Sequence, residues 1–83
     1  MNHHTSPEFW KAFDRLPTDI QLLARSNYEL LKDDPRHPSL HFKKVAGYWS
    51  VRVGLGYRAL GTDVADGVLW FFIGTHGRYD RLT

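Results

Sequence analysis

The sequence predicts an α+β domain in which two amino-terminal antiparallel helices pack on one face of a small antiparallel sheet, with a meander of three or four strands after the helices. Apolar residues recur at helical spacing between Phe9 and Leu31, and from Leu40 onward they alternate with a period of two. Glycine-containing turns divide the second part into short strands. A run of helices followed by a run of strands is typical of α+β domains.

The composition excludes several classes of protein. Hydrophobic residues make up 42% of the chain, which is typical of a folded globule, and the length suits a single domain over residues 1–83. No apolar run approaches the roughly 18 residues of a membrane span, and the first residues lack the apolar core of a signal peptide. We therefore expect a cytoplasmic protein with no membrane partner. The chain has no cysteine, which excludes disulfides and cysteine metal sites.

The charge is distributed unevenly along the chain, although the formal net charge is only +2. Residues 1–35 carry four basic and six acidic side chains, whereas residues 36–83 carry seven basic and three acidic ones. A basic half on a nearly neutral chain indicates a polyanionic partner, but ordinary surface charge also accounts for an excess of this size.

The first helix begins near Ser6, and the sequence allows two alternatives for its N-cap. Either Thr5 caps the helix while Glu8 reaches back, or Ser6 caps it with Pro7 at the first helical position. The residues before it, Met1–His4, form either a short edge strand or a loose end.

The second helix follows after a tight connection at Pro17. Residues 18–21 (Thr-Asp-Ile-Gln) predict a capping box, and the apolar pattern continues to about Lys32 or Asp33. Two amphipathic helices with such a short connection form an antiparallel pair.

Four segments after the proline-containing loop at residues 34–39 have the features of strands. In the first, Leu40 and Phe42 face one side while His41 and Lys43 face the other. The last one, VLWFFI, is apolar at every position, which predicts a strand that is covered on both faces or central in the sheet. The other expected strands span residues 48–55 and 57–62.

Two arginines flank the tight turn at residues 54–56. Val51 and Val53 point toward the helices, so Arg52 points to the opposite face. If the turn pairs position 52 with position 58, Arg58 emerges on the same face. Adjacent guanidinium groups repel each other, which favours a bound phosphate or carboxylate between them. The alternative is a salt bridge from each arginine to an acid of the same chain.

Further candidate residues flank the strands. His76 can act as a general acid or base near neutral pH, and Tyr79 can hydrogen-bond a reacting hydroxyl. The alternative is that His76 is an ordinary surface histidine and that Tyr79 packs on the sheet. The histidines lack a metal-ligand spacing, so no metal ion is expected. Basic side chains that could contact phosphates, or simply line a solvated edge, are His41, Lys43 and Lys44.

Three ordered segments, DDPRHPSLHFKKV, YWSVRVGLGYRALG and VLWFFIGTHGRYDRL, make the chain resemble the RelE/ParE toxin superfamily of type II toxin–antitoxin modules, and most of all its RelE-like branch. The resemblance extends from about Pro7 to Leu82 and implies a compact β-α-α-β-β-β fold with a short first strand. RelE-like members are metal-independent endoribonucleases that cut messenger RNA, often on the ribosome. The resemblance therefore implies an RNA-cleaving toxin without a cofactor and with a cognate antitoxin as partner.

The resemblance also implies roles for individual residues. Arg52 and Arg58 match the basic positions that stabilise the pentacoordinate phosphate, and His76 and Tyr79 match positions that transfer protons or orient the ribose 2′-OH. Ser50 occupies a place where some relatives carry a lysine. The residues expected to hold the RNA are His41, Lys43, Lys44, Arg78 and Arg81. ParE-like members share the fold but poison DNA gyrase, so the alternative is a gyrase inhibitor or a binding protein of this fold without catalysis.

Overall fold

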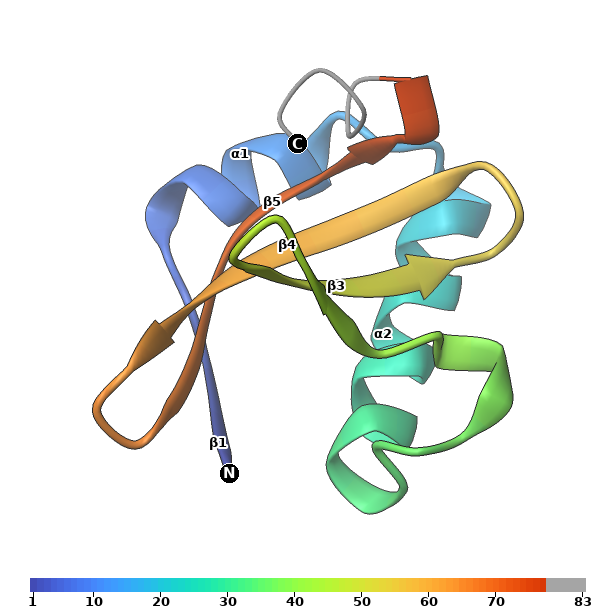
Figure 1. The fold of residues 1–83 in the computed structure, drawn as a ribbon. Helices are drawn as coiled ribbons and strands as arrows, with labels where there is room; N and C mark the ends of the chain where they lie inside the picture. The colour runs from blue at the N-terminus through green and yellow to red at the C-terminus, as the bar shows by residue number, and fades with distance from the viewer. Residues whose placement is uncertain (78–83) are drawn as a thin grey trace.

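The computed structural model describes residues 1–77 and confirms the α+β class, with two helices and a five-stranded sheet (Figure 1). The helical elements are α1 (Pro7–Asp14), α2 (Thr18–Asp33) and the short 3-10 helix η1 (Pro38–Leu40). The strands are β1 (Asn2–Thr5), β2 (Lys43–Val45), β3 (Tyr48–Val53), β4 (Tyr57–Val64) and β5 (Gly67–Thr75). Neither α1 nor α2, the helices of residues 1–77, has the length and apolar character needed to cross a membrane.

The sheet has the strand order β1-β5-β4-β3-β2. Strands β2 to β5 form the predicted antiparallel meander, and β1 adds to its edge in parallel with β5. Both helices lie on the same side of the sheet, behind it in Figure 1. Their apolar faces meet the helix-facing side chains of the strands in one core. Its buried members are Phe13, Ala24, Leu31, Leu40, Val51, Val53, Ala59, Val68, Trp70 and Ile73.

Ser6 begins α1, which decides between the two predicted caps. Its hydroxyl oxygen accepts a hydrogen bond from the Phe9 amide, and Pro7 occupies the first turn. Thr5 instead accepts a hydrogen bond from the indole N–H of Trp10 at 3.0 Å. This bond joins the end of β1 to the surface of α1.

The capping box predicted at residues 18–21 is wrong. The helix α2 begins directly after Pro17, and no side chain caps it. The Gln21 side chain reaches back to α1 instead, where its amide N–H donates to the carbonyl oxygens of Phe13 and Leu16, each at 3.1 Å. The last carbonyls of a helix lack partners within that helix, so Gln21 satisfies them and ties the two helices together.

A bulge explains why the last strand is apolar at every position. Leu60 pairs with Phe72, but the next residue, Gly61, pairs with Trp70, so Phe71 is an extra residue on β5. The alternation reverses there. Trp70 contributes to the core under the helices, whereas Phe71 and Phe72 pack with Leu60 on the opposite face. The strand is thus covered by apolar packing on both faces.

The strand predicted from Leu40 begins only at Lys43. Residues 38–40 form η1, and His41 follows in the left-handed backbone region with φ 47°. A left-handed residue interrupts an extended run, and histidine is among the residues that tolerate it. His41 therefore stands at a bend before β2, not within a strand.

His3 is held between β5 and α2. Its Nδ1 accepts a hydrogen bond from the indole Nε1 of Trp70 at 3.1 Å, and the two rings stack with centroids 6.1 Å apart. Because an indole N–H can only donate, Nδ1 of His3 carries no proton in this arrangement. Burial lowers the pKa of His3, and the nearby amino terminus, His4 and Lys32 lower it further.

We expect acid to destabilise the protein through His3. The pKa of His3 in the folded chain lies below its ordinary value of 6.5, so the unfolded chain binds the proton more readily. The contribution of neutral His3 to the free energy of unfolding is complete above about pH 6.5 and declines as the pH falls below it. Urea unfolding from about pH 7 to about pH 5 should show this decline, and His3→Asn should weaken it. His4→Asn, at an exposed histidine, is the matched control; an unchanged pH dependence in His3→Asn would contradict the assignment.

Candidate functional site

Arg52 of β3 and Arg58 of β4 lie directly opposite each other in the sheet. The neighbouring pairs, Val51 with Ala59 and Val53 with Tyr57, place the valines in the core under the helices. Side chains alternate along a strand, so both arginines emerge on the face away from the helices. The structure thus confirms that position 52 pairs with position 58, the register that puts both arginines on one face. We call these two residues the arginine pair.

The turn at Gly54 helps to set this register. Gly54 has a left-handed φ of 65°, which glycine adopts without strain. A Cβ at this position would lie 3.0 Å from Cδ2 of Leu23 on α2. Both the backbone conformation and the close approach of the helix therefore favour glycine here.

Buried residues lie beside the arginine pair on the same face. Ser50 is only 2% exposed, and Leu60, its partner across the strands, is fully buried. Phe72 of β5 packs against Leu60. Electrostatic interactions are stronger next to such a poorly hydrated surface than in open water. An anion held by the arginine pair would benefit from this effect.

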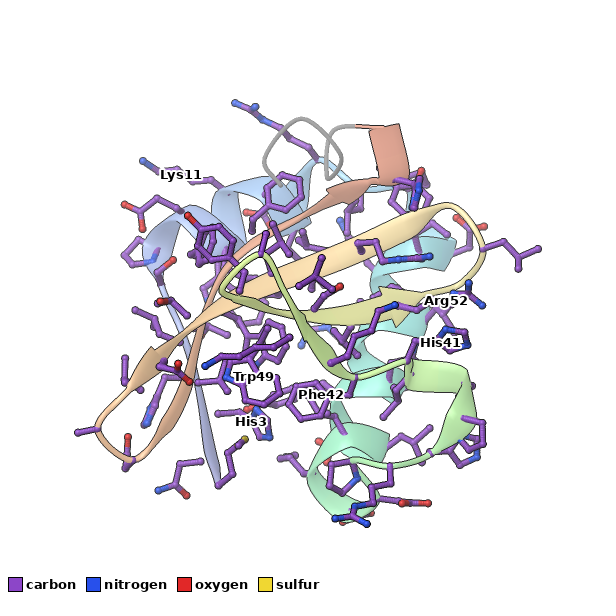
Figure 2. The ribbon with its side chains drawn as sticks, in the orientation of Figure 1. His3, Lys11, His41, Phe42, Trp49 and Arg52 are labelled. Atoms are coloured by element: carbon purple, nitrogen blue, oxygen red, sulfur yellow. The ribbon has the colours of Figure 1, made fainter. Side chains whose placement is uncertain are left out.

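The guanidinium of Arg52 has unused hydrogen-bonding capacity. Its Nε is buried and has no hydrogen-bond partner, while its Nη1 lies 3.4 Å from Nε2 of His41 (Figure 2). The predicted alternative, a salt bridge from Arg52 to an acid, is not observed within residues 1–77. The ion pairs recorded there are His4–Asp66, Lys32–Glu29 and Lys44–Asp63.

Arg58 is half-buried and is oriented partly by its own strand. Its Nη1 donates a hydrogen bond to the carbonyl oxygen of Tyr57 at 2.9 Å. On the other side it faces Gly74 of β5. Glu29 of α2 forms its ion pair with Lys32 of the same helix.

His41 lies in the electrostatic field of the basic side chains. The pKa of His41 is lowered first by the positive charge of Arg52, then by burial, and then by Lys43 and Arg58. A histidine whose pKa lies below 6.5 is mostly neutral at pH 7. We call His41, Lys43, Arg52 and Arg58 the basic cluster.

The two predicted lysines of β2 point to opposite faces of the sheet. Lys43 shares the face of the arginine pair, because it pairs with Ser50 across β2 and β3. Lys44 turns to the opposite face, where it forms an ion pair with Asp63 and lies over the ring of Trp49. The structure therefore does not bring Lys44 to the basic cluster.

His76 follows β5, at the turn between β3 and β4. Its backbone N–H donates to the carbonyl oxygen of Gly56 at 2.7 Å, and its side chain is exposed. It thus lies at the same end of the sheet as the arginine pair. Tyr79, Arg78 and Arg81 lie outside the described residues.

The close contact between His41 and Arg52 is the part of the site that sequence reasoning missed. The alternation put His41 and Lys43 on one side, but the bend at His41 was not visible in it. No group of three or more His, Asp or Glu side chains within residues 1–77 is arranged to hold a metal ion. The chemistry available in the described part of the site is therefore that of guanidinium, ammonium and imidazole groups.

Comparison with solved structures identifies the fold. A chain of the RelB–RelE antitoxin–toxin complex of Methanococcus jannaschii superposes with a TM-score of 0.73 at 19% identity, covering 96% of this chain and 99% of that one. A YoeB/ParE toxin from Agrobacterium tumefaciens gives 0.67 at 16% identity, covering 92% and 99%. The intact Escherichia coli RelBE complex gives 0.63 at 12% identity, covering 88% and 93%. No family model and no curated protein matches the sequence. The chain thus has the fold of the RelE and YoeB/ParE toxins.

Proposed function

We propose that this chain is the toxin of a type II toxin–antitoxin pair and that it inhibits translation by cutting messenger RNA without a metal ion. The observation that supports this most is the arginine pair. Two guanidinium groups stand opposite each other on the face of the sheet away from the helices, and Arg52 has a buried N–H without a partner among residues 1–77. Guanidinium groups match the geometry of phosphate oxygens, and the cost of burying an unpaired donor falls when an anion accepts from it.

The reaction we propose is an internal transfer within RNA. The ribose 2′-oxygen forms a bond to the adjacent phosphorus while the bond from phosphorus to the 5′-oxygen breaks, which leaves a 2′,3′-cyclic phosphate and a 5′-hydroxyl. Arg52 and Arg58 stabilise the extra negative charge on the phosphate oxygens. His76 and Tyr79 transfer protons or orient the 2′-OH, as the family resemblance implies.

The proposed partner is an antitoxin that covers the open sheet face with an acidic or amphipathic segment. The solved relatives from M. jannaschii and E. coli are complexes of RelE with RelB. The basic cluster offers a complementary charge for such a segment. Messenger RNA, bound on the ribosome, is the proposed substrate.

Cleavage in a translation extract tests the proposal. We expect wild-type protein to fragment messenger RNA when ribosomes are present, and Arg58→Ala to slow this at least about tenfold through loss of a transition-state donor. Lys44→Ala is the matched control, because it removes a cation of the same sheet, on β2, that points to the opposite face. Primer extension on the extracted RNA measures the rate.

Intact messenger RNA after incubation with wild-type protein and ribosomes would overturn the proposal. A loss of gyrase supercoiling activity together with intact RNA would favour a gyrase inhibitor instead. If Arg58→Ala and Lys44→Ala lowered the cleavage rate equally, the rate would depend on the total positive charge and not on the arginine pair.

A further inference from the structure

The bend before β2 brings an imidazole directly beside the arginine pair. His41 Nε2 lies 3.4 Å from Nη1 of Arg52. A guanidinium has only donors, so Nε2 presents its lone pair to it, and the ring proton of neutral His41 is on Nδ1. The nitrogen that can accept a proton therefore lies next to the group proposed to hold the phosphate.

We propose that His41 is a catalytic residue, the base that removes the proton from the ribose 2′-OH. This inference rests on the proposed ribonuclease function and deepens it. When a phosphate binds, its oxygens replace Nε2 as the acceptor for Arg52, and the lone pair of His41 is released toward the neighbouring ribose. His41 thus does more than hold the RNA backbone, the role that the sequence predicted for it.

The proton balance of this step is simple. As the 2′-oxygen bonds to phosphorus, its proton moves to Nε2 of His41, which becomes an imidazolium. The 5′-oxygen leaves with the electron pair of its bond to phosphorus and takes a proton from His76 or from water. His41 then returns its proton to solvent, and no redox partner is needed.

The charges around His41 suit a base that works near neutral pH. Arg52 on β3, Lys43 on β2 and Arg58 on β4 all oppose a positive charge on the ring and lower its pKa, and no carboxylate of residues 1–77 contributes to that shift. His41 is therefore ready to accept a proton in the resting protein. The bound phosphate then offsets part of the repulsion when the imidazolium forms.

The test compares His41→Asn with His4→Asn. Asparagine tolerates the left-handed backbone at position 41, so the variant keeps the bend, and a thermal melt by circular dichroism checks its fold. His4 is an exposed histidine whose ring bonds to Asp66 of the turn before β5, which makes it the matched control. Two quantities are measured: the single-turnover cleavage rate on ribosome-bound messenger RNA across the pH range, and the affinity for the same RNA with a 2′-deoxy sugar at the cut.

We expect His41→Asn to lower the maximal rate about 100-fold and to remove the fall in rate below about pH 6.5. Affinity for the uncleavable RNA should change less than about twofold, and added imidazole should restore part of the rate. The control should behave like wild type. A normal cleavage rate with a normal pH profile in His41→Asn would overturn the inference, and so would a loss of rate that weaker RNA binding alone explains. The proposed function is tested separately, by the cleavage rate of Arg58→Ala. Absence of cleavage by wild-type protein would overturn both.

Discussion

Replacing Arg52 by leucine is expected to reduce RNA cleavage about 100- to 1,000-fold and at the same time to raise the free energy of unfolding. The activity falls because a donor to the developing phosphate charge is lost. The stability rises, by about 1 kcal/mol, because the buried Nε without a partner and the repulsion from Arg58 disappear together. Urea unfolding and the cleavage assay on the same preparation measure the two effects.

Arg25→Leu is the matched control for this prediction. Arg25 lies on α2, where its guanidinium stands over the ring of Phe13 at 5.0 Å. The same substitution there removes a cation from the helix side of the molecule and should leave cleavage unchanged. A destabilised Arg52→Leu variant, or one with undiminished cleavage, would contradict the view that Arg52 is kept for an anionic ligand.

Replacing Trp70 by alanine is expected to lower the free energy of unfolding by about 3–5 kcal/mol. Trp70 is 3% exposed in the core under the helices, and its indole N–H bonds to His3. The substitution leaves a cavity and also detaches the side chain that fixes β1 on β5. Urea unfolding monitored by circular dichroism provides the measurement.

Trp10→Ala is the control that shows how much of the stability lost in Trp70→Ala comes from the burial of the side chain. Trp10 is 40% exposed, and its indole N–H donates to Thr5. We expect a loss of about 1 kcal/mol in this control. Similar losses in Trp10→Ala and Trp70→Ala would indicate that the core under the helices is not the main source of stability.

The parts of the fold that were predictable follow from simple alternation. Val51 and Val53 indicated which way Arg52 points, and the glycine turn indicated its partner across the strands; the structure confirms both. The bulge at Phe71 was not predictable, because a segment that is apolar at every position contains no alternation from which a reversal can be read. It is recognised only when the pairing partners of β4 and β5 are known.

The site was less predictable than the fold, because it depends on a local bend of the backbone at His41. In the fold, Gln21 left its predicted capping box because the carbonyl oxygens of Phe13 and Leu16 are nearby in space and accept from its side chain. His41 left its predicted strand because η1 ends in a left-handed residue there. Neither event has a signal in hydrophobic spacing, and the second one puts the imidazole beside Arg52.

The parallel pairing of β1 with β5 has a consequence for the order of folding. Asn2 pairs with Gly67, and a Cβ on that glycine would lie 1.9 Å from the carbonyl oxygen of Asn2. The first strand can pair only when β5 is present, and closing so long a loop is slow compared with forming the local hairpins. The local hairpins therefore form first, and the docking of β1 on β5 completes the sheet.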